Sequence, residues 1–347
     1  MYFDNRKYET VFILGSGASR GAIPHVLHNQ KRIKPPLNSD FFKVAETYAR
    51  ACGPESPESK RLERINKSLE ESFLTQQSLL TMESAFSFFY MAKDFPAIYS
   101  KRRGKRRDPG DSKEIEDFLH LSFGILTLLD QCDQKQNQYD KLVENLTPSD
   151  TLISLNYDTL LDSALYRKGW NPEVGYKIIG GSSKHRWKQR NINKDLSNIS
   201  LLKLHGSLNW YVKGSFSDLS SVFEKKPSII AQPRKNEISD HLRQIIPPIY
   251  GKVFGHDHWR LLWSEAYRAL CGAEVLVVIG CSLIDTDFHL RALIWRAIQR
   301  RKHNNQFKRI YIVDRKFVRQ KWQNALKSGY RCINSYNKFS KFIEMEV

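Results

Sequence analysis

The chain has 347 residues, of which 41% are hydrophobic and 27% charged, a composition typical of soluble globular proteins. No apolar run approaches the roughly 20 residues of a membrane span. The N-terminus also lacks the layout of a signal peptide, so we expect a cytoplasmic protein that does not enter the membrane. The formal net charge of +18 favours acidic partners, including nucleic acid.

Short apolar runs predict a parallel sheet built from two separated parts of the chain. Val11 to Leu14 forms one such run, and a regular alternation of strands and helices resumes near residue 150. The strands predicted there cover residues 151–155, 201–204, 275–279 and 310–313, with helices at 159–167 and 288–299. We therefore predict an α/β fold, a Rossmann-like parallel sheet with helices on both faces.

The residues between these two parts have a different pattern. Apolar side chains recur at helical spacing in residues 61–72, 79–91 and 115–129. We expect two units as a result. Residues 1–50 together with 142–347 would form the sheet domain, and residues 51–141 would form a helical insertion.

Two further compositional features concern charge and cysteine. The basic run Lys101 to Arg107 is either a solvated loop or a contact with nucleic acid or a partner protein, and a shorter run at Arg300 to Lys302 would also support nucleic-acid binding. The cysteines are odd in number and no two form a Cys-x-x-Cys pair, which supports neither a disulfide framework nor a zinc site. We expect no bound metal, and buried apolar thiols at Cys52, Cys132, Cys271, Cys281 and Cys332.

Five polar or glycine-rich segments directly follow predicted strands. In an open parallel sheet, ligands bind in the crevice at the carboxyl ends of the strands, so these segments are expected to converge on one site. They are Gly15-Ser16-Gly17-Ala18-Ser19, Asn156-Tyr157-Asp158, His205-Gly206-Ser207, Gly280-Cys281-Ser282 and Asp314.

Each of these segments also has a simpler interpretation. The glycine segment could be a plain turn, because Arg20 stands where the dinucleotide fingerprint has its third glycine. Asn156 and Asp158 are good helix N-caps, and His205 alone could be a half-buried histidine. The shared position at one edge of the sheet favours a binding site, where glycine lets the backbone approach a pyrophosphate and Arg20 can pair with a phosphate.

Together the motifs resemble those of a known family. Residues 15–19 with Ile23-Pro24, Asn156-Tyr157-Asp158, and Leu204-His205-Gly206-Ser207 are similar to the sirtuin motifs. A closer resemblance is to the sirtuin-like (SIR2-like) NAD⁺ hydrolases of bacterial anti-phage defence. It rests also on Asn209-Trp210, Ile246-Pro247-Pro248 with Lys252, and Ile279 to Leu283 with Asp287 and His289.

The resemblance covers the sheet portion and not residues 52–141. It implies that NAD⁺ is the substrate, that the nicotinamide–ribose bond is hydrolysed to nicotinamide and ADP-ribose, and that NAD⁺ depletion halts infected cells. Protein-deacylating sirtuins carry a zinc module with two Cys-x-x-Cys pairs, which this sequence lacks. Deacylation is therefore disfavoured. The relatives also suggest self-assembly and a second defence protein, such as a HerA-type ATPase.

Site roles follow from the same resemblance. Asn156 would orient a water or the ribose, and His205, whose unperturbed pKa is near ~6.5, would accept a proton from water or a ribose hydroxyl. Asp158 would bind the carboxamide or fix its loop. The remaining candidates would hold phosphate and ribose groups: Gly15, Ser16, Gly17, Ala18, Ser19, Arg20, Gly280, Cys281, Ser282 and, for the adenosine ribose, Asp314. Two alternatives stay open, an NAD⁺ or ADP-ribose sensor without turnover and a regulatory subunit that binds nucleic acid.

Overall fold

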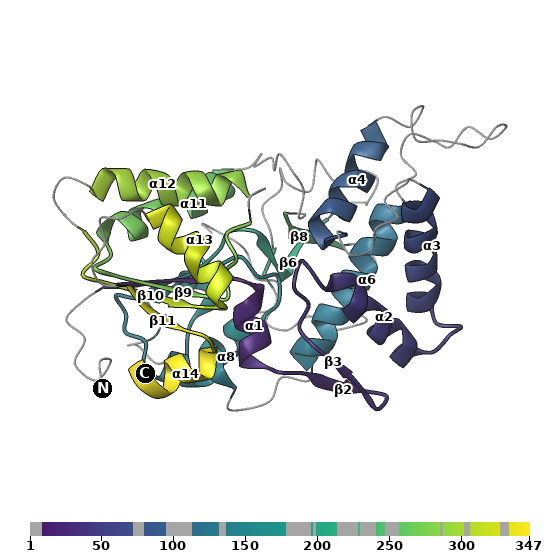
Figure 1. Cartoon of the computed structure of the whole chain (residues 1–347), viewed down its shortest axis with the longest axis horizontal. Coiled ribbons are helices and arrows are strands. Elements are labelled where there is room, and N and C mark those ends of the chain that lie inside the picture. Colours follow the sequence, from purple (N-terminus) through teal and green to yellow (C-terminus); the bar gives the residue numbers. More distant parts are fainter. Residues whose placement is uncertain are drawn as a thin grey trace.

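The computed structural model shows a layered α/β body beside a group of helices (Figure 1). Lys101 to Arg107, Pro247-Pro248, Lys252 and two of the cysteines lie outside the described residues. The structure describes residues 9–71, 80–94, 113–131, 137–177, 196, 199–213, 228–229, 241–246, 257–284, 287–301, 306–326 and 333–347.

The central sheet has six parallel strands in the spatial order β11-β10-β9-β1-β4-β5. In chain order this is the doubly wound arrangement 3-2-1-4-5-6, which confirms the predicted Rossmann-like class. The order reverses between β1 and β9, which pair in register with Phe12 opposite Val277. The strands are β1 (Thr10–Leu14), β4 (Thr151–Ser154), β5 (Ser200–Lys203), β9 (Val275–Ile279), β10 (Arg309–Val313) and β11 (Ile333–Tyr336).

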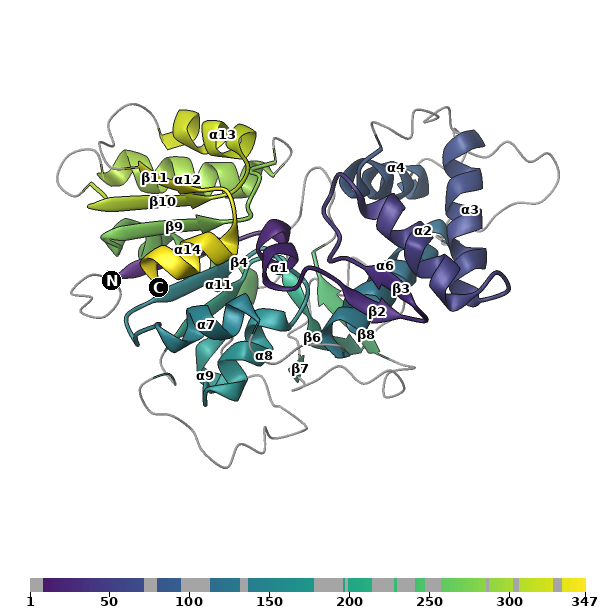
Figure 2. The same cartoon turned by 60° about the horizontal axis from the view of Figure 1, so that its bottom comes forward.

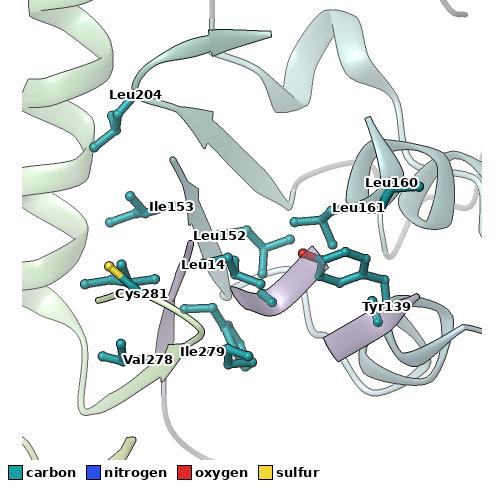
Figure 3. Packing of buried hydrophobic residues seen from close by; sticks show 14 of the residues in the cluster. Leu14, Tyr139, Leu152, Ile153, Leu160, Leu161, Leu204, Val278, Ile279 and Cys281 are labelled. Carbon is teal, nitrogen blue, oxygen red and sulfur yellow. The ribbon is translucent and has the colours of Figure 1, made fainter. Parts of the chain in front are cut away.

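The strands are apolar because helices cover both faces of the sheet. In β4, Leu152 points toward Leu161 and Tyr139, whereas its neighbour Ile153 points to the opposite side (Figure 3). Every residue of β1 and β9 is buried. Such continuous apolar runs are typical of parallel strands in the middle of a doubly wound sheet.

Two groups of helices form these layers, as Figures 1 and 2 show. One group contains α1 (Ser16–Ala22), α7 (Gln138–Glu144), α8 (Leu160–Arg167) and α14 (Phe339–Glu346), with the short α9 (Pro172–Gly175) beside β5. The other contains α11 (Asp257–Gly272), α12 (Phe288–Arg301) and α13 (Lys316–Leu326). The helix expected at 159–167 begins at Leu160, with Thr159 as its N-cap rather than Asn156 or Asp158.

The helical part packs around its own aromatic residues. The ring of Phe118 stacks on Phe41 with centroids 4.9 Å apart and meets the ring of Phe86 edge-on at 5.4 Å. The Arg64 guanidinium binds the buried Asp117 carboxylate through two hydrogen bonds of 2.6 and 2.8 Å. The helices are α2 (Phe41–Cys52), α3 (Pro57–Glu71), α4 (Met82–Asp94) and α6 (Lys113–Gln131), the last three matching the predicted helical segments.

Two small antiparallel sheets were not predicted from the sequence. A hairpin of β2 (Val26–His28) and β3 (Lys31–Ile33) packs on α2. A three-stranded sheet in the order β7-β6-β8 follows the central sheet's edge strand β5. It consists of β6 (Gly206–Lys213), β7 (Ser228–Ile229) and β8 (His241–Ile245).

Some expectations about single residues need correction. Arg301 does not belong to an exposed basic patch, because its buried guanidinium donates hydrogen bonds to the carbonyls of Leu270, Cys271 and Ala273. Of the cysteines that the structure describes, Cys281 is buried, whereas Cys52 and Cys271 are half-buried. None of the described helices is long and apolar enough to cross a membrane.

Candidate functional site

A pocket lies at the carboxyl ends of β1 and β9, where the strand order reverses. It brings together four of the five predicted strand exits, represented by Gly15, Asn156, His205 and Gly280. Its other wall comes from the helical part and the segment before it, namely Pro35, Pro36, Leu37, Asn38, Phe41, Met82, Glu83, Ser122 and Leu126. The pocket therefore lies between the sheet and the helical part.

The glycines of the site pack the first loop against the loop after β9. Gly280 has φ +59°, and a Cβ atom there would lie 2.0 Å from the amide nitrogen of Ala18. The Gly17 amide donates to the Gly280 carbonyl at 2.9 Å, and the Gly15 amide donates to Ile279 at 3.0 Å. Gly15 and Ser16 line the pocket, whereas Gly17 and Ala18 do not and instead lie against the Gly280 backbone.

Asn156 is held by the glycine loop. Its side-chain amide donates to the Gly15 carbonyl and to the Ser19 hydroxyl, both at 2.9 Å. The Ser19 hydroxyl donates in turn to Asp158 Oδ2 at 2.8 Å and lies 3.0 Å from the Tyr139 hydroxyl. These bonds link the exits of β1 and β4 into one buried polar network.

Asp158 lies deep in this network. Burial raises the pKa of its carboxyl, and the ammonium of Lys203 opposes that rise. Lys203 is itself fully buried and binds the Asp158 carbonyl at 2.5 Å and the Asp162 carboxylate at 3.1 Å. Asp158 Oδ1 also accepts a bond from the amide of Leu160 at 3.3 Å, which ties it to the start of α8.

His205 forms a close pair with a carboxylate. Its Nε2 atom lies 3.0 Å from Asp287 Oδ2, and the two side chains are 9% and 6% exposed. The turn that places the imidazole requires glycine next to it, because Gly206 has φ +82° and its Cβ would lie 2.2 Å from the Gln244 carbonyl. Asp287 precedes α12 and accepts a bond from the amide of Leu290, so the helix fixes the carboxylate.

Aromatic rings flank the imidazole. The ring centroids of Tyr157 and Trp263 lie 6.5 and 6.4 Å from that of His205. The Tyr157 hydroxyl donates to the Ile246 carbonyl at 2.6 Å, and burial raises the pKa of this phenol, which keeps it protonated. The ring of Tyr157 is therefore a fixed wall of the pocket.

Cys281 and Ser282 complete the wall on the β9 side. Burial raises the pKa of the Cys281 thiol to about 12, so this sulfur stays protonated and is a packing group at neutral pH. The Trp322 indole donates to the Cys281 carbonyl at 2.6 Å and anchors the loop. Ser282 is exposed and lines the pocket.

Arg20 and Asp314, like Gly17 and Ala18, are sequence candidates that lie outside the pocket lining. Arg20 forms two hydrogen bonds with Asp40, at 2.5 and 2.9 Å, and one with the Pro35 carbonyl at 2.7 Å. It thereby holds the segment that forms one wall. Asp314 follows β10, one strand further from the reversal, and accepts a bond from the amide of Arg315 at 2.7 Å. Burial raises the pKa of the Asp314 carboxyl.

Other lining residues were not among the sequence candidates for the site. Asp287 and Glu83 are buried carboxylates, and Tyr157 is the central residue of the Asn-Tyr-Asp motif. Asp287 stands just before a predicted helix, where an N-cap explains it equally well, and Glu83 is one of several glutamates in a helical pattern. In the described part of the chain, no three His, Cys, Asp or Glu side chains cluster as a metal site would require.

The fold and the pocket define an α/β protein of the doubly wound type with a ligand site at its switch point. The chain belongs to the SIR2-like family, because the sequence model of the SIR2-like domain matches residues 150–333. The match begins just before β4 and so does not include the glycine loop. A search of curated proteins finds no match.

Solved structures similar to this chain include Sir2 homologues. A Sir2 homologue–NAD complex has 10% identity and a TM-score of 0.40, with 97% of this chain and 88% of that chain covered. A mutant Sir2 homologue in complex with ADP-ribose has 11% identity and a TM-score of 0.43, with 97% and 90% covered. A further Sir2 enzyme structure has 13% identity and a TM-score of 0.40, with the same coverage.

Proposed function

We propose that this protein binds NAD⁺ in the pocket and hydrolyses the bond between nicotinamide and ribose. The observation that carries the proposal is the His205–Asp287 pair, at 3.0 Å, in the same pocket as Gly15, Ser16 and Asn156. Membership of the SIR2-like family and the motif resemblance supply the substrate class. The His205–Asp287 pair supplies an imidazole that can accept a proton next to the bound substrate.

The charge of the pocket suits this reaction. Nicotinamide leaves as a neutral pyridine, so the leaving group needs no general acid, but positive charge develops on the ribose. Glu83, Asp158 and Asp287 line the pocket, whereas no Lys or Arg among the described residues does so. Preorganised carboxylates near a developing cation stabilise the transition state.

The roles of the polar residues follow from their contacts. His205 accepts a proton from water or from a ribose hydroxyl, and Asp287 stabilises the imidazolium that forms. Asn156, fixed by Gly15 and Ser19, orients the water or the ribose. Gly15, Ser16, Ser19 and Ser282 are the lining residues from which we expect contacts with phosphate and ribose.

The biological role belongs to the same proposal. Hydrolysis of NAD⁺ would deplete the cofactor in an infected bacterium and so act in abortive anti-phage defence. The resemblance also supports assembly with copies of the chain and with a second defence protein, such as a HerA-type ATPase.

Nicotinamide release by the purified protein tests the proposal. We expect His205→Ala to lose activity by about 10²-fold or more, because positioned proton transfer contributes about 10²–10⁴-fold. Asn156→Ala is expected to lose activity because the water or the ribose is no longer oriented. His120→Ala is the matched control, since His120 lies on α6 and outside the pocket lining. If either pocket variant keeps most of its turnover, the roles are wrong; if NAD⁺ binds without any release, the protein is a sensor.

A further inference from the structure

A second concave surface lies between α11 and α12. This groove has a volume of about 890 Å³, and its lining includes Trp263, whose ring centroid lies 6.4 Å from that of His205. The residues that matter for its chemistry are Arg260, Trp263, Tyr267, His289, Arg296 and Arg300. None of them is used by the proposed reaction.

The groove is strongly basic. Arg260 and Arg268 pair with carboxylates on their own helix, at Asp257 and Glu265. Arg296 and Arg300 are exposed, and neither has an ion pair among the described residues. Because they are four positions apart on α12, their guanidinium groups lie on one face of that helix.

Aromatic surfaces alternate with these cations. Trp263 and Tyr267 are half-buried, four positions apart on α11, and the ring centroid of His289 on α12 lies 6.0 Å from that of Trp263. Beside the groove, the Arg296 guanidinium lies 5.2 Å from the ring of Trp295, a side chain that is 49% exposed. Partly exposed rings between cations fit a ligand that has both flat apolar faces and negative charges.

The length of the groove indicates the size of that ligand. Its lining runs along α11 from Trp259 to Cys271, which corresponds to about 18 Å of helix. Stacked nucleotides repeat at roughly 3.4 Å along one strand, so about five of them match this length. A single mononucleotide would contact only part of it.

We infer that the groove between α11 and α12 binds single-stranded nucleic acid, with Arg296 and Arg300 pairing with phosphates and Tyr267 and Trp263 offering rings to the bases. Single strands are favoured over duplexes because their bases are free to stack on side chains. The inference goes beyond the proposed NAD⁺ reaction and does not depend on it, since binding is measured without turnover.

Fluorescence anisotropy tests this with labelled single-stranded DNA and RNA about twelve nucleotides long, titrated at several salt concentrations. The logarithm of the binding constant falls as the logarithm of the salt concentration rises, and each lost phosphate contact to a single strand makes this slope less steep by about 0.7. The double variant Arg296→Ala/Arg300→Ala is therefore expected to make the slope less steep by about 1.4. Lys31→Ala/Arg32→Ala removes the same charge from the exposed hairpin β2–β3 and is expected to leave the slope unchanged.

A second variant tests the stacking surface. Tyr267→Ala is expected to weaken binding by about 5- to 150-fold, the range measured for loss of one base–aromatic contact, whereas Tyr267→Phe keeps the ring and the affinity. Unlabelled AMP serves as a competitor that separates a mononucleotide site from a strand site. The inference is overturned if wild-type protein does not bind, if both double variants change the slope equally, or if AMP or duplex DNA competes as well as the single strand.

Discussion

The imidazole of His205 is held by a carboxylate from a distant part of the chain. His205 follows β5, at one edge of the sheet, whereas Asp287 follows β9 on the other side of β1. The 3.0 Å contact joins two strand exits that are far apart in the sequence. At the scale of single residues, this pair is the feature on which the proposed proton transfer depends.

Asp287→Asn is expected to lower the rate of nicotinamide release by about 10²–10⁴-fold, because the amide cannot stabilise an imidazolium as a carboxylate does. The amide oxygen can still accept the hydrogen bond from the Leu290 amide, so α12 is expected to stay capped and the midpoint of thermal unfolding to change little. Chromatography of the products and a thermal melt provide the two readouts.

Asp257→Asn is the matched control, since Asp257 begins α11 but is exposed and lies outside the pocket. Its turnover is expected to equal that of the unchanged protein. Full activity in Asp287→Asn would show that His205 works without this carboxylate.

At the scale of elements, the loops after β1 and β9 are packed backbone against backbone. Gly280→Ala would place a Cβ 2.0 Å from the Ala18 amide nitrogen and would also strain a residue at φ +59°. Gly53→Ala is the matched control, because Gly53 has φ +105° but nothing lies within 4 Å of its added Cβ. Both variants therefore strain the backbone, but only one forces two loops apart.

We expect Gly280→Ala to lower the free energy of unfolding by about 1–3 kcal/mol more than Gly53→Ala does, which is the usual penalty of overpacking. Urea denaturation of the two variants measures the difference. Equal losses of stability would mean that the two loops are not packed as the structure shows.

The same elements show how far the sequence predicts the fold. The apolar runs at 11–14, 151–155 and 275–279 predicted parallel strands, and the polar residues after them predicted the edge at which the pocket lies. Strand order was not predictable, because it depends on which apolar strands pack side by side. The β6–β8 sheet was missed as well, since its pairing joins segments far apart in the sequence.

The site residues show a similar limit. Gly15, Asn156 and His205, which the structure places in the pocket lining, were selected because each directly follows a predicted strand. Asp287 was named only as part of the family resemblance and was given no role in the site, and a helix N-cap alone would account for an aspartate in that position. Arg20 was predicted to pair with a phosphate, and in the structure it binds the carboxylate of Asp40. The sequence could not separate these two possibilities, because an arginine pairs with either kind of anion.

At the scale of the whole molecule, buried carboxylates make stability depend on pH. Burial raises the pKa of Asp130 well above 3.8, and the neighbouring Asp158 carboxylate adds to this rise. The folded protein therefore keeps a proton on Asp130 at pH values where the unfolded chain has lost it. Above a pH of about 4, stability falls as the pH rises toward the folded-state pKa.

Asp130→Asn is expected to reduce this fall, since an amide does not titrate. A single carboxyl contributes a slope of at most about 1.4 kcal/mol per pH unit. Urea denaturation at several pH values between 4 and 8 measures the slope for both proteins. An unchanged slope in the variant would mean that Asp130 titrates alike in the folded and unfolded chains.

The chain has a formal net charge of +18, yet the described lining of the pocket holds carboxylates and no Lys or Arg, whereas four arginines line the groove between α11 and α12. A positive field of this kind attracts anionic ligands to the molecule. The pocket itself favours a developing cation. The two surfaces therefore suit different ligands.

Product analysis after incubation with NAD⁺ is the most direct test of the proposed hydrolysis. The protein is incubated with NAD⁺ alone and together with the protein encoded beside it, and nicotinamide and ADP-ribose are separated by chromatography. We expect the two products in equal amounts from the unchanged protein and neither from His205→Ala. NAD⁺ that stays intact in both conditions, although it binds to the protein, would contradict hydrolysis and leave a nucleotide sensor.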